Sequence, residues 1–202
     1  RVNRLEPSSL WHVGIRGTMV RGGVRVTIAV VRRVPAVGQA SQHFWLPAAL
    51  LSAEAAALGG AHGALIASSA SKPMTIATYV CVHLPVAMHF GWITAAAVVS
   101  ANSFAQVARW APSTKLSFAF VSVWLAVATA AGVSITTGDP VIALTVAWAL
   151  SAVAADGGKS DTNEFGDVPL KALAHSAATA AKGLSGIGLL IIAKNGLEVL
   201  RS

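Results

Sequence analysis

The sequence of 202 residues contains few charged residues, and this scarcity excludes most soluble folds. Asp, Glu, Lys and Arg together make up 11% of the chain, whereas 54% of the residues are hydrophobic. Soluble globular domains carry about 25% charged residues. A chain of this composition has too little polar surface to cover a water-soluble core, so we expect lipid to surround it. The length suits a single bundle of about four or five membrane spans.

Cysteine is almost absent, and the familiar catalytic motifs are missing. Cys81 is the only cysteine, which excludes an intrachain disulfide and a cysteine-based zinc motif, and we expect a small buried thiol there. The sequence contains no GxxxxGK[ST], GxSxG, HExxH or CxxC motif, and no two of its six histidines have the i,i+4 spacing of a helical metal site. We therefore predict a protein that is not an enzyme, with no catalytic residue and no metal site.

Acidic residues are scarce too, and the basic excess is concentrated at the start of the chain. The net charge is +7, and seven of the basic residues lie among the first thirty-three. We predict a basic interfacial or docking arm over residues 1–43, because such arms meet anionic lipid headgroups or partner subunits. Nucleic acid is not an expected partner, since no recognition domain surrounds the arm. The candidate contact residues of the arm are Trp11, Arg16, Arg21, Arg25, Arg32 and Arg33.

The basic residues also bear on topology and processing. The positive-inside rule places the arm on the cytoplasm-like side of the membrane, which in an organelle is the stroma or the matrix. The chain begins at Arg1 rather than Met, so we interpret it as a processed protein or a fragment whose targeting sequence is missing.

Long apolar runs are what the sequence does contain. Between Lys72 and Arg109 lie thirty-six residues without a charge, more than the ~20 that cross a hydrocarbon core of ~30 Å as a helix. Pro85 should kink this span, and Gly138-Asp139-Pro140 predicts a tight turn. We predict an all-α polytopic membrane helix bundle over residues 44–202 with four to five transmembrane helices. The predicted helices cover residues 44–70, 74–108, 116–137, 141–155 and 170–200, the last either spanning or partly interfacial.

Several polar residues lie within these spans. An ionisable side chain at membrane depth faces a cavity or a partner because its exposure to hydrocarbon is costly. For Glu54 two interpretations stay open, a protonated carboxyl bonded to a neighbouring helix or a ligand contact. Asn102 and Gln106 are one helical turn apart, so we expect them to face the bundle interior. A neutral imidazole nitrogen of His62, His83 or His89 could bind a chlorophyll magnesium. Lipid or partner contacts are also expected for Lys171, His175 and Lys182, which share one stripe of the last helix.

Two stretches resemble a known family. LPVAMHFGWITAAAVVSAN, residues 84–102, is similar to the segment LPxxxHxGWxxAAxxxxxN of the TspO-like, tryptophan-rich sensory protein relatives of algae and cyanobacteria. DPVIALTVAWALSAVA, residues 139–154, resembles the penultimate helix of that family with its VxWAL core. The resemblance covers about residues 44–198. It implies a five-helix bundle and, in the wider family, the binding of tetrapyrroles or sterol-like molecules in an interior cavity.

The resemblance also identifies individual residues. The matching positions are His89, Gly91, Trp92, Asn102 and Trp148, which either contact a ligand or pack. In the packing interpretation, Gly91 permits close helix contact and the two tryptophans fill a core. The candidate ligand-binding residues are Glu54, His62, His83, His89, Trp92, Asn102, Gln106 and Trp148.

Three hypotheses for function follow. The first is an accessory subunit of a photosystem or light-harvesting supercomplex in a plastid thylakoid. It would pack against other integral membrane subunits and hold chlorophyll, carotenoid or lipid. The second is a stand-alone TspO-like binding protein or transporter for a tetrapyrrole or other apolar ligand. The third is an accessory subunit of a respiratory complex or ATP synthase in the mitochondrial inner membrane.

Overall fold

The structure is a computed structural model that describes residues 19–20, 23–24, 45–71, 74–156 and 162–201. They belong to two compact units, residues 1–39 and 40–202. In the first unit, β1 (Met19–Val20) and β2 (Gly23–Val24) pair antiparallel, with Met19 opposite Val24. The predicted contact residues of the arm lie outside the described residues: Trp11, Arg16, Arg21, Arg25, Arg32 and Arg33.

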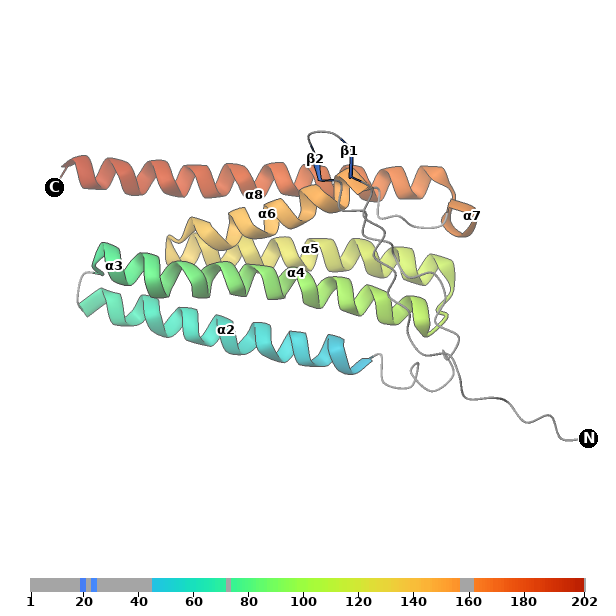
Figure 1. Ribbon diagram of the computed structural model, residues 1–202, viewed down its shortest axis with the longest axis horizontal. Coiled ribbons are helices and arrows are strands. Elements are labelled where there is room, and N and C mark those ends of the chain that lie inside the picture. Colours follow the sequence, from blue (N-terminus) through green and yellow to red (C-terminus); the bar gives the residue numbers. More distant parts are fainter. Residues whose placement is uncertain (1–18, 21–22, 25–44, 72–73, 157–161, 202) are drawn as a thin grey trace, which may run out of the picture. The chain divides into compact units, whose positions relative to one another are not determined.

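The second unit is a bundle of long helices that run up and down along one direction (Figure 1). Its elements are α2 (Trp45–Ser71), α3 (Ile76–Thr78), the π-helical turn η2 (Tyr79–His83), α4 (Leu84–Val107), α5 (Pro112–Thr137), α6 (Pro140–Asp156), α7 (Thr162–Phe165) and α8 (Asp167–Arg201). Helix α2 packs on α4, whereas α6 packs on α4, α5 and α8. The predicted all-α helix bundle is therefore confirmed.

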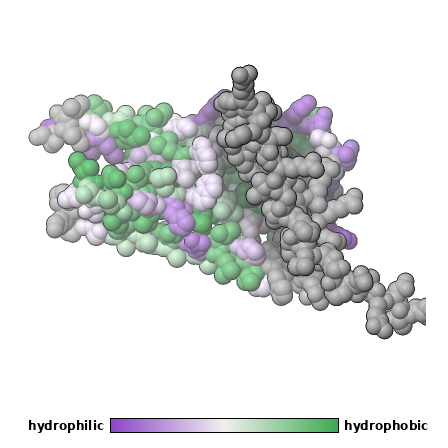
Figure 2. Space-filling view, viewed as in Figure 1, coloured by the Kyte–Doolittle hydropathy of each residue, from purple (hydrophilic) through white to green (hydrophobic). Residues whose placement is uncertain are grey.

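The helices are long and apolar enough for a membrane. Four candidate spans cover residues 45–69, 76–107, 112–137 and 167–198, and α6 is apolar but shorter, with 17 residues. Most residues of each span are not buried inside the bundle. Figure 2 shows hydrophobic surface along much of the visible face of the helices. An apolar outer surface of this extent is expected where lipid surrounds the protein.

Small residues hold the helices close together. Alanine is the commonest residue of the buried core, which includes Ala87, Ala126 and Ala147. A Cβ atom added at Gly91 of α4 would lie 2.8 Å from Cβ of Thr145 in α6, closer than carbon atoms can pack. The packing interpretation of Gly91 is thus confirmed, because the α4–α6 contact leaves no room for a side chain.

A π-helical turn lies where the sequence predicts a kink. Pro85 has no N–H, and its ring crowds the carbonyl group four residues earlier. The wider turn of η2 avoids this crowding, and the N–H of Leu84 donates to the carbonyl of Tyr79, five residues back. Cys81 lies in this turn and is exposed, so the expectation of a buried thiol is wrong. A thiol that faces lipid satisfies the same apolar preference as a buried one.

Candidate functional site

A cavity of about 470 Å³ lies between α4, α5, α6 and α8. Its lining is mostly aliphatic, from residues such as Val98, Ala126 and Leu150. Pockets for small molecules have volumes of about 300–1,000 Å³ and combine apolar walls with a few polar groups. The polar side chains of the lining are Asn102, Ser103, Gln106, Lys115 and Ser122.

Asn102 is the polar residue that the structure positions most firmly in this cavity. Its Nδ2 donates to Oγ of Ser122 at 2.8 Å and to the carbonyl oxygen of Val98 at 2.9 Å. These bonds use both amide hydrogens. The amide oxygen of Asn102 accepts no hydrogen bond among the residues that the structure describes, so it can accept one from a ligand. Asn102 and Gln106 both line the cavity, but Asn102 is partly buried whereas Gln106 is exposed, so the predicted inward face does not extend to Gln106.

The same end of the bundle carries an ion pair that the sequence analysis does not predict. Nζ of Lys115, near the start of α5, donates to Oε1 of Glu164 in α7 at 2.6 Å. The Lys115 ammonium also lies 6.0 Å from the ring centroid of Phe165, which lines the cavity. The stretch between the last two predicted helices, residues 156–169, thus includes the helical turn α7, which pairs with Lys115 beside the cavity. The acidic residues of this stretch were the available signal for a basic partner.

A second, more open groove of about 780 Å³ lies along α4 and α6. Trp92 and Trp148 line it with ring centroids 5.4 Å apart. Their exposed fractions are 49% and 61%, so the interpretation that they fill a core is wrong. Nε2 of His89, which also lines the groove, lies 3.1 Å from Oε1 of Glu54 in α2. This is the bond to a neighbouring helix that was one of the two interpretations of Glu54.

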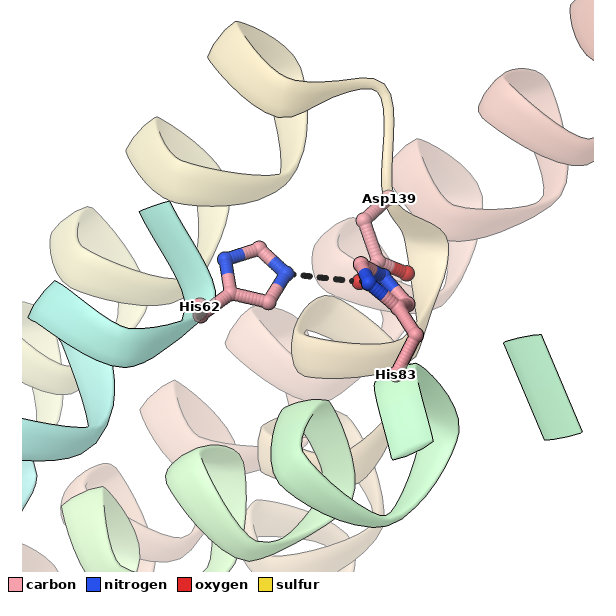
Figure 3. A group of neighbouring side chains, drawn as sticks. All are labelled: His62, His83 and Asp139. Atoms are coloured by element: carbon pink, nitrogen blue, oxygen red, sulfur yellow. Dashed lines mark hydrogen bonds and ion pairs between the residues drawn. The ribbon is translucent and has the colours of Figure 1, made fainter. Parts of the chain in front are cut away.

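A buried polar cluster of His62, His83 and Asp139 lies at the other end of the bundle (Figure 3). His62 comes from α2, His83 from η2 and Asp139 from the turn between α5 and α6. Nε2 of each imidazole lies 2.8 Å from the same oxygen, Oδ2 of Asp139. The three residues are 1%, 2% and 4% exposed, so water does not compete for these bonds.

Local structure orients the carboxylate of Asp139. Gly138 ends α5 with a φ of 70°, a left-handed conformation that glycine adopts without strain. Asp139 then caps α6, since its Oδ1 accepts from the backbone N–H of Val141 at 3.0 Å. Burial raises the pKa of Asp139, but hydrogen bonds from His62, the Val141 amide and His83 outweigh burial and hold the pKa below its ordinary value. These hydrogen bonds favour the ionised form of the carboxylate.

The imidazole of His83 is only partly satisfied. Its ring stacks on Tyr79, with centroids 5.2 Å apart, and lies 5.1 Å from the ring of His62. Its Nδ1 is buried and has no hydrogen-bond partner among the described residues. Such atoms are rare inside proteins and mark sites that need an explanation.

The structure thus separates the candidates that the sequence groups together. Asn102 and Gln106 lie in the cavity, the two tryptophans with His89 and Glu54 lie at the groove, and the buried histidines form the polar cluster. Sequence reasoning missed Asp139, which appeared only as a turn residue. The signal for a functional role was its position, because this acidic residue stands directly before Pro140 between two long apolar runs. Outside these sites lie three exposed residues of α8: Lys171, His175 and Lys182.

Together, the apolar spans define a helical membrane protein with an apolar cavity between its helices. The model of the TSPO-like protein family matches residues 41–190, about three quarters of the chain. The chain therefore belongs to the TSPO-like family, as its motifs indicated. Comparison with curated proteins and with solved structures gives no match.

Proposed function

We propose that this protein binds a neutral apolar molecule with one hydroxyl group in the cavity between α4, α5, α6 and α8. The observation that carries the proposal is the cavity itself, with about 470 Å³ of mostly aliphatic space and Asn102 at its wall. Apolar walls supply affinity through desolvation, and one or two polar groups set the ligand's orientation. Membership of the TSPO-like family supports a ligand of this apolar class.

The charges of the lining favour a neutral ligand over a dicarboxylate tetrapyrrole. Lys115 is the cation of the lining, and Glu164 already pairs with its ammonium group at 2.6 Å. An anionic ligand would have to displace Glu164 or lie in an apolar cavity without a counter-ion, which is costly. A sterol-like or carotenoid hydroxyl needs only an acceptor, which the Asn102 oxygen supplies.

Binding without turnover fits the chemistry of the lining. Its hydroxyl groups belong to Ser103 and Ser122, and both donate to backbone carbonyls of their own helices. Neither has a hydrogen bond to a histidine or carboxylate in the described part of the chain, which nucleophilic catalysis would require. We therefore keep the proposal of a protein that is not an enzyme.

A ligand pair and two leucine variants test this function. A fluorescent sterol and its 3-deoxy analogue are titrated into the purified protein in nanodiscs. We expect saturable binding of one sterol per protein. The sterol should bind about 2- to 10-fold more tightly than its 3-deoxy analogue, and this difference should disappear in Asn102→Leu. Ala119→Leu fills the cavity and should abolish binding, whereas Ala128→Leu, exposed on the same helix, should not. Equal sterol affinities of Ala119→Leu and Ala128→Leu would overturn the proposal. If protoporphyrin bound more tightly than the sterol, the class of ligand would be anionic rather than neutral.

A specific observation favours a second candidate function, that of an accessory subunit. Glu54 and His89 form a polar pair whose side chains are 46% and 51% exposed on the outside of a bundle that we place in lipid. Such a pair is costly against hydrocarbon, so a neighbouring subunit or a pigment that covers it would stabilise it. The partner that we propose first is a photosystem or light-harvesting complex of the thylakoid, with chlorophyll or carotenoid in the groove. The alternative is a respiratory complex or ATP synthase of the mitochondrial inner membrane.

Isolation from the native membrane in mild detergent tests the accessory role. The protein should comigrate with a larger complex, and chlorophyll absorbance in that complex would distinguish the photosynthetic partner from the respiratory one. Migration of the protein alone would refute both forms of this candidate.

A further inference from the structure

We propose that His62, His83 and Asp139 bind one divalent transition-metal ion, with zinc as the best-fitting ion. The three side chains offer two imidazole nitrogens and a carboxylate oxygen, and their ligand atoms lie within 4.8 Å of one another. Imidazole and carboxylate are zinc ligands, and a nitrogen-rich set disfavours magnesium and calcium, which prefer oxygen. This inference is independent of the apolar cavity, which lies at the other end of the bundle.

The distances leave little rearrangement for binding. Both Nε2 atoms lie 2.8 Å from Oδ2 of Asp139. Zinc bonds of about 2.0–2.1 Å in tetrahedral geometry place neighbouring ligand atoms roughly 3.3 Å apart. Each imidazole therefore has to move away from Oδ2 by about 0.5 Å, and the two Nε2 atoms, which lie within 4.8 Å of each other, have to end roughly 3.3 Å apart. Each histidine binds the ion as a neutral imidazole, so the proton that Nε2 donates to Asp139 moves by exchange with solvent to Nδ1 of the same ring, and the Nε2 lone pair bonds to the ion.

The ligands are held in place by three different elements. Helix α2 carries His62, the π-helical turn carries His83, and the capped turn before α6 carries Asp139. The Val141 amide binds Oδ1, which leaves Oδ2 directed at both imidazoles, as outer-shell hydrogen bonds do in metal sites. π-helical turns are often found at functional sites. Preorganised, buried ligands of this kind lower the cost of binding an ion.

A closed hydrogen-bond network does not account for the cluster. Two imidazoles share a single carboxylate oxygen, while Nδ1 of His83 is buried without a partner in the described part of the chain. An ion bonded to both Nε2 atoms relieves the crowding of two imidazoles on one oxygen, whereas Nδ1 of His83 then carries a proton and is not a ligand. Three protein ligands leave a fourth position of a tetrahedral ion open to water or to a small ligand.

Metal binding to the purified, full-length protein tests the proposal. The protein is treated with EDTA, dialysed, and titrated with Co²⁺ and Zn²⁺ in a Cys81→Ala background that removes the exposed thiol. We expect one ion per chain and the visible d–d absorption of four-coordinate Co²⁺. His62→Ala should weaken binding by at least about 10-fold. The matched control is His89→Ala, whose half-exposed imidazole lies outside the cluster, and it should bind as the parent does.

A cysteine variant keeps the test decisive if His62→Ala fails to fold. His62→Cys retains a zinc ligand and should bind Co²⁺ with a new sulfur-to-cobalt charge-transfer band. Absence of stoichiometric binding by the parent protein would overturn the proposal, as would binding that His62→Ala and His89→Ala weaken equally. A cobalt spectrum without that new band in the folded cysteine variant would also overturn it.

Discussion

Substitution of Gly91 by alanine should destabilise the bundle, because α4 and α6 meet at this residue. A Cβ atom there would lie 2.8 Å from Cβ of Thr145, 3.0 Å from its Cγ2 and 3.4 Å from the carbonyl oxygen of Ile142. Carbon atoms pack at about 3.5–4.0 Å, so the two helices would have to separate by roughly 1 Å. Overpacking of a well-packed core costs about 1–3 kcal/mol. Alanine regains about 0.5–1 kcal/mol of helix propensity, which leaves a net loss of up to about 2.5 kcal/mol.

Gly63→Ala is a matched control for which we expect a gain in stability rather than a loss. Gly63 lies in α2, and a Cβ added there meets nothing within 4 Å. Gly63→Ala should therefore show only the propensity gain and stabilise the protein by up to about 1 kcal/mol. Two identical chemical changes in neighbouring helices thus differ only in what surrounds the new methyl group.

The assay is the free energy of unfolding of the purified protein in lipid nanodiscs or mixed micelles, followed by helical circular dichroism. The double variant Gly91→Ala/Thr145→Gly removes the atoms that clash, so it should recover stability beyond the sum of the single effects. Trp92 and Trp148 lie along the same helix pair, so their fluorescence should change in Gly91→Ala and not in Gly63→Ala. The reasoning would be refuted if Gly91→Ala were as stable as Gly63→Ala.

Three further predictions concern polar contacts and use the same unfolding assay. In chelator-treated protein, His62→Ala should cost about 2–4 kcal/mol, because it removes a donor from the buried carboxylate of Asp139. The same substitution should cost less in an Asp139→Asn background, and strictly additive losses would contradict the pairing. Ser122→Ala takes an acceptor from Asn102 at the cavity wall and should cost about 1 kcal/mol, so an unchanged stability would argue against that bond. Glu54→Gln should change stability by less than about 1 kcal/mol, because glutamine can keep the bond to His89 without placing a charge against hydrocarbon, and a larger loss would contradict this.

The sequence predicts the helices well because membrane spans are long and apolar. The first span was predicted over residues 44–70, and α2 covers Trp45–Ser71. Whether the last helix spans the membrane could not be decided from the sequence, since Lys171 and Lys182 lie in its first half. In the structure α8 has 35 residues, more than a span needs, so Lys171 can lie near its end outside the hydrocarbon.

Which apolar residues face inward could not be predicted in the same way. In water an exposed tryptophan is unfavourable, so a helical stripe of aromatic residues usually marks a core. In a bundle surrounded by lipid the outer face is apolar too, and this cost disappears. Trp92, Trp148 and Cys81 are therefore exposed although their chemistry suggested burial.

The polar cluster was beyond sequence reasoning for a different reason. Asp139 bonds residues 56 and 77 positions earlier in the chain, so no local spacing reveals the contact. Each histidine alone resembled a candidate pigment ligand, and the aspartate resembled an ordinary turn residue. Only the packing of α2 on α4 and of α4 on α6 brings the three together.

The length of α6 accounts for the position of this cluster. Its 17 residues extend for only about 26 Å, so the turn before it ends short of α3 and of the C-terminal end of α8 (Figure 1). Backbone groups of a turn buried in this way need partners within the protein. Ser134 accepts from the Ala143 amide, Asn195 donates to the Gly138 carbonyl, and Asp139 caps the helix. Oδ1 of Asp139 accepts from the backbone of α6, so Oδ2 also needs hydrogen-bond partners in this buried place. The imidazoles of His62 and His83 supply them. The ligand-type side chains are thus gathered at the end of a helix that is shorter than the bundle around it.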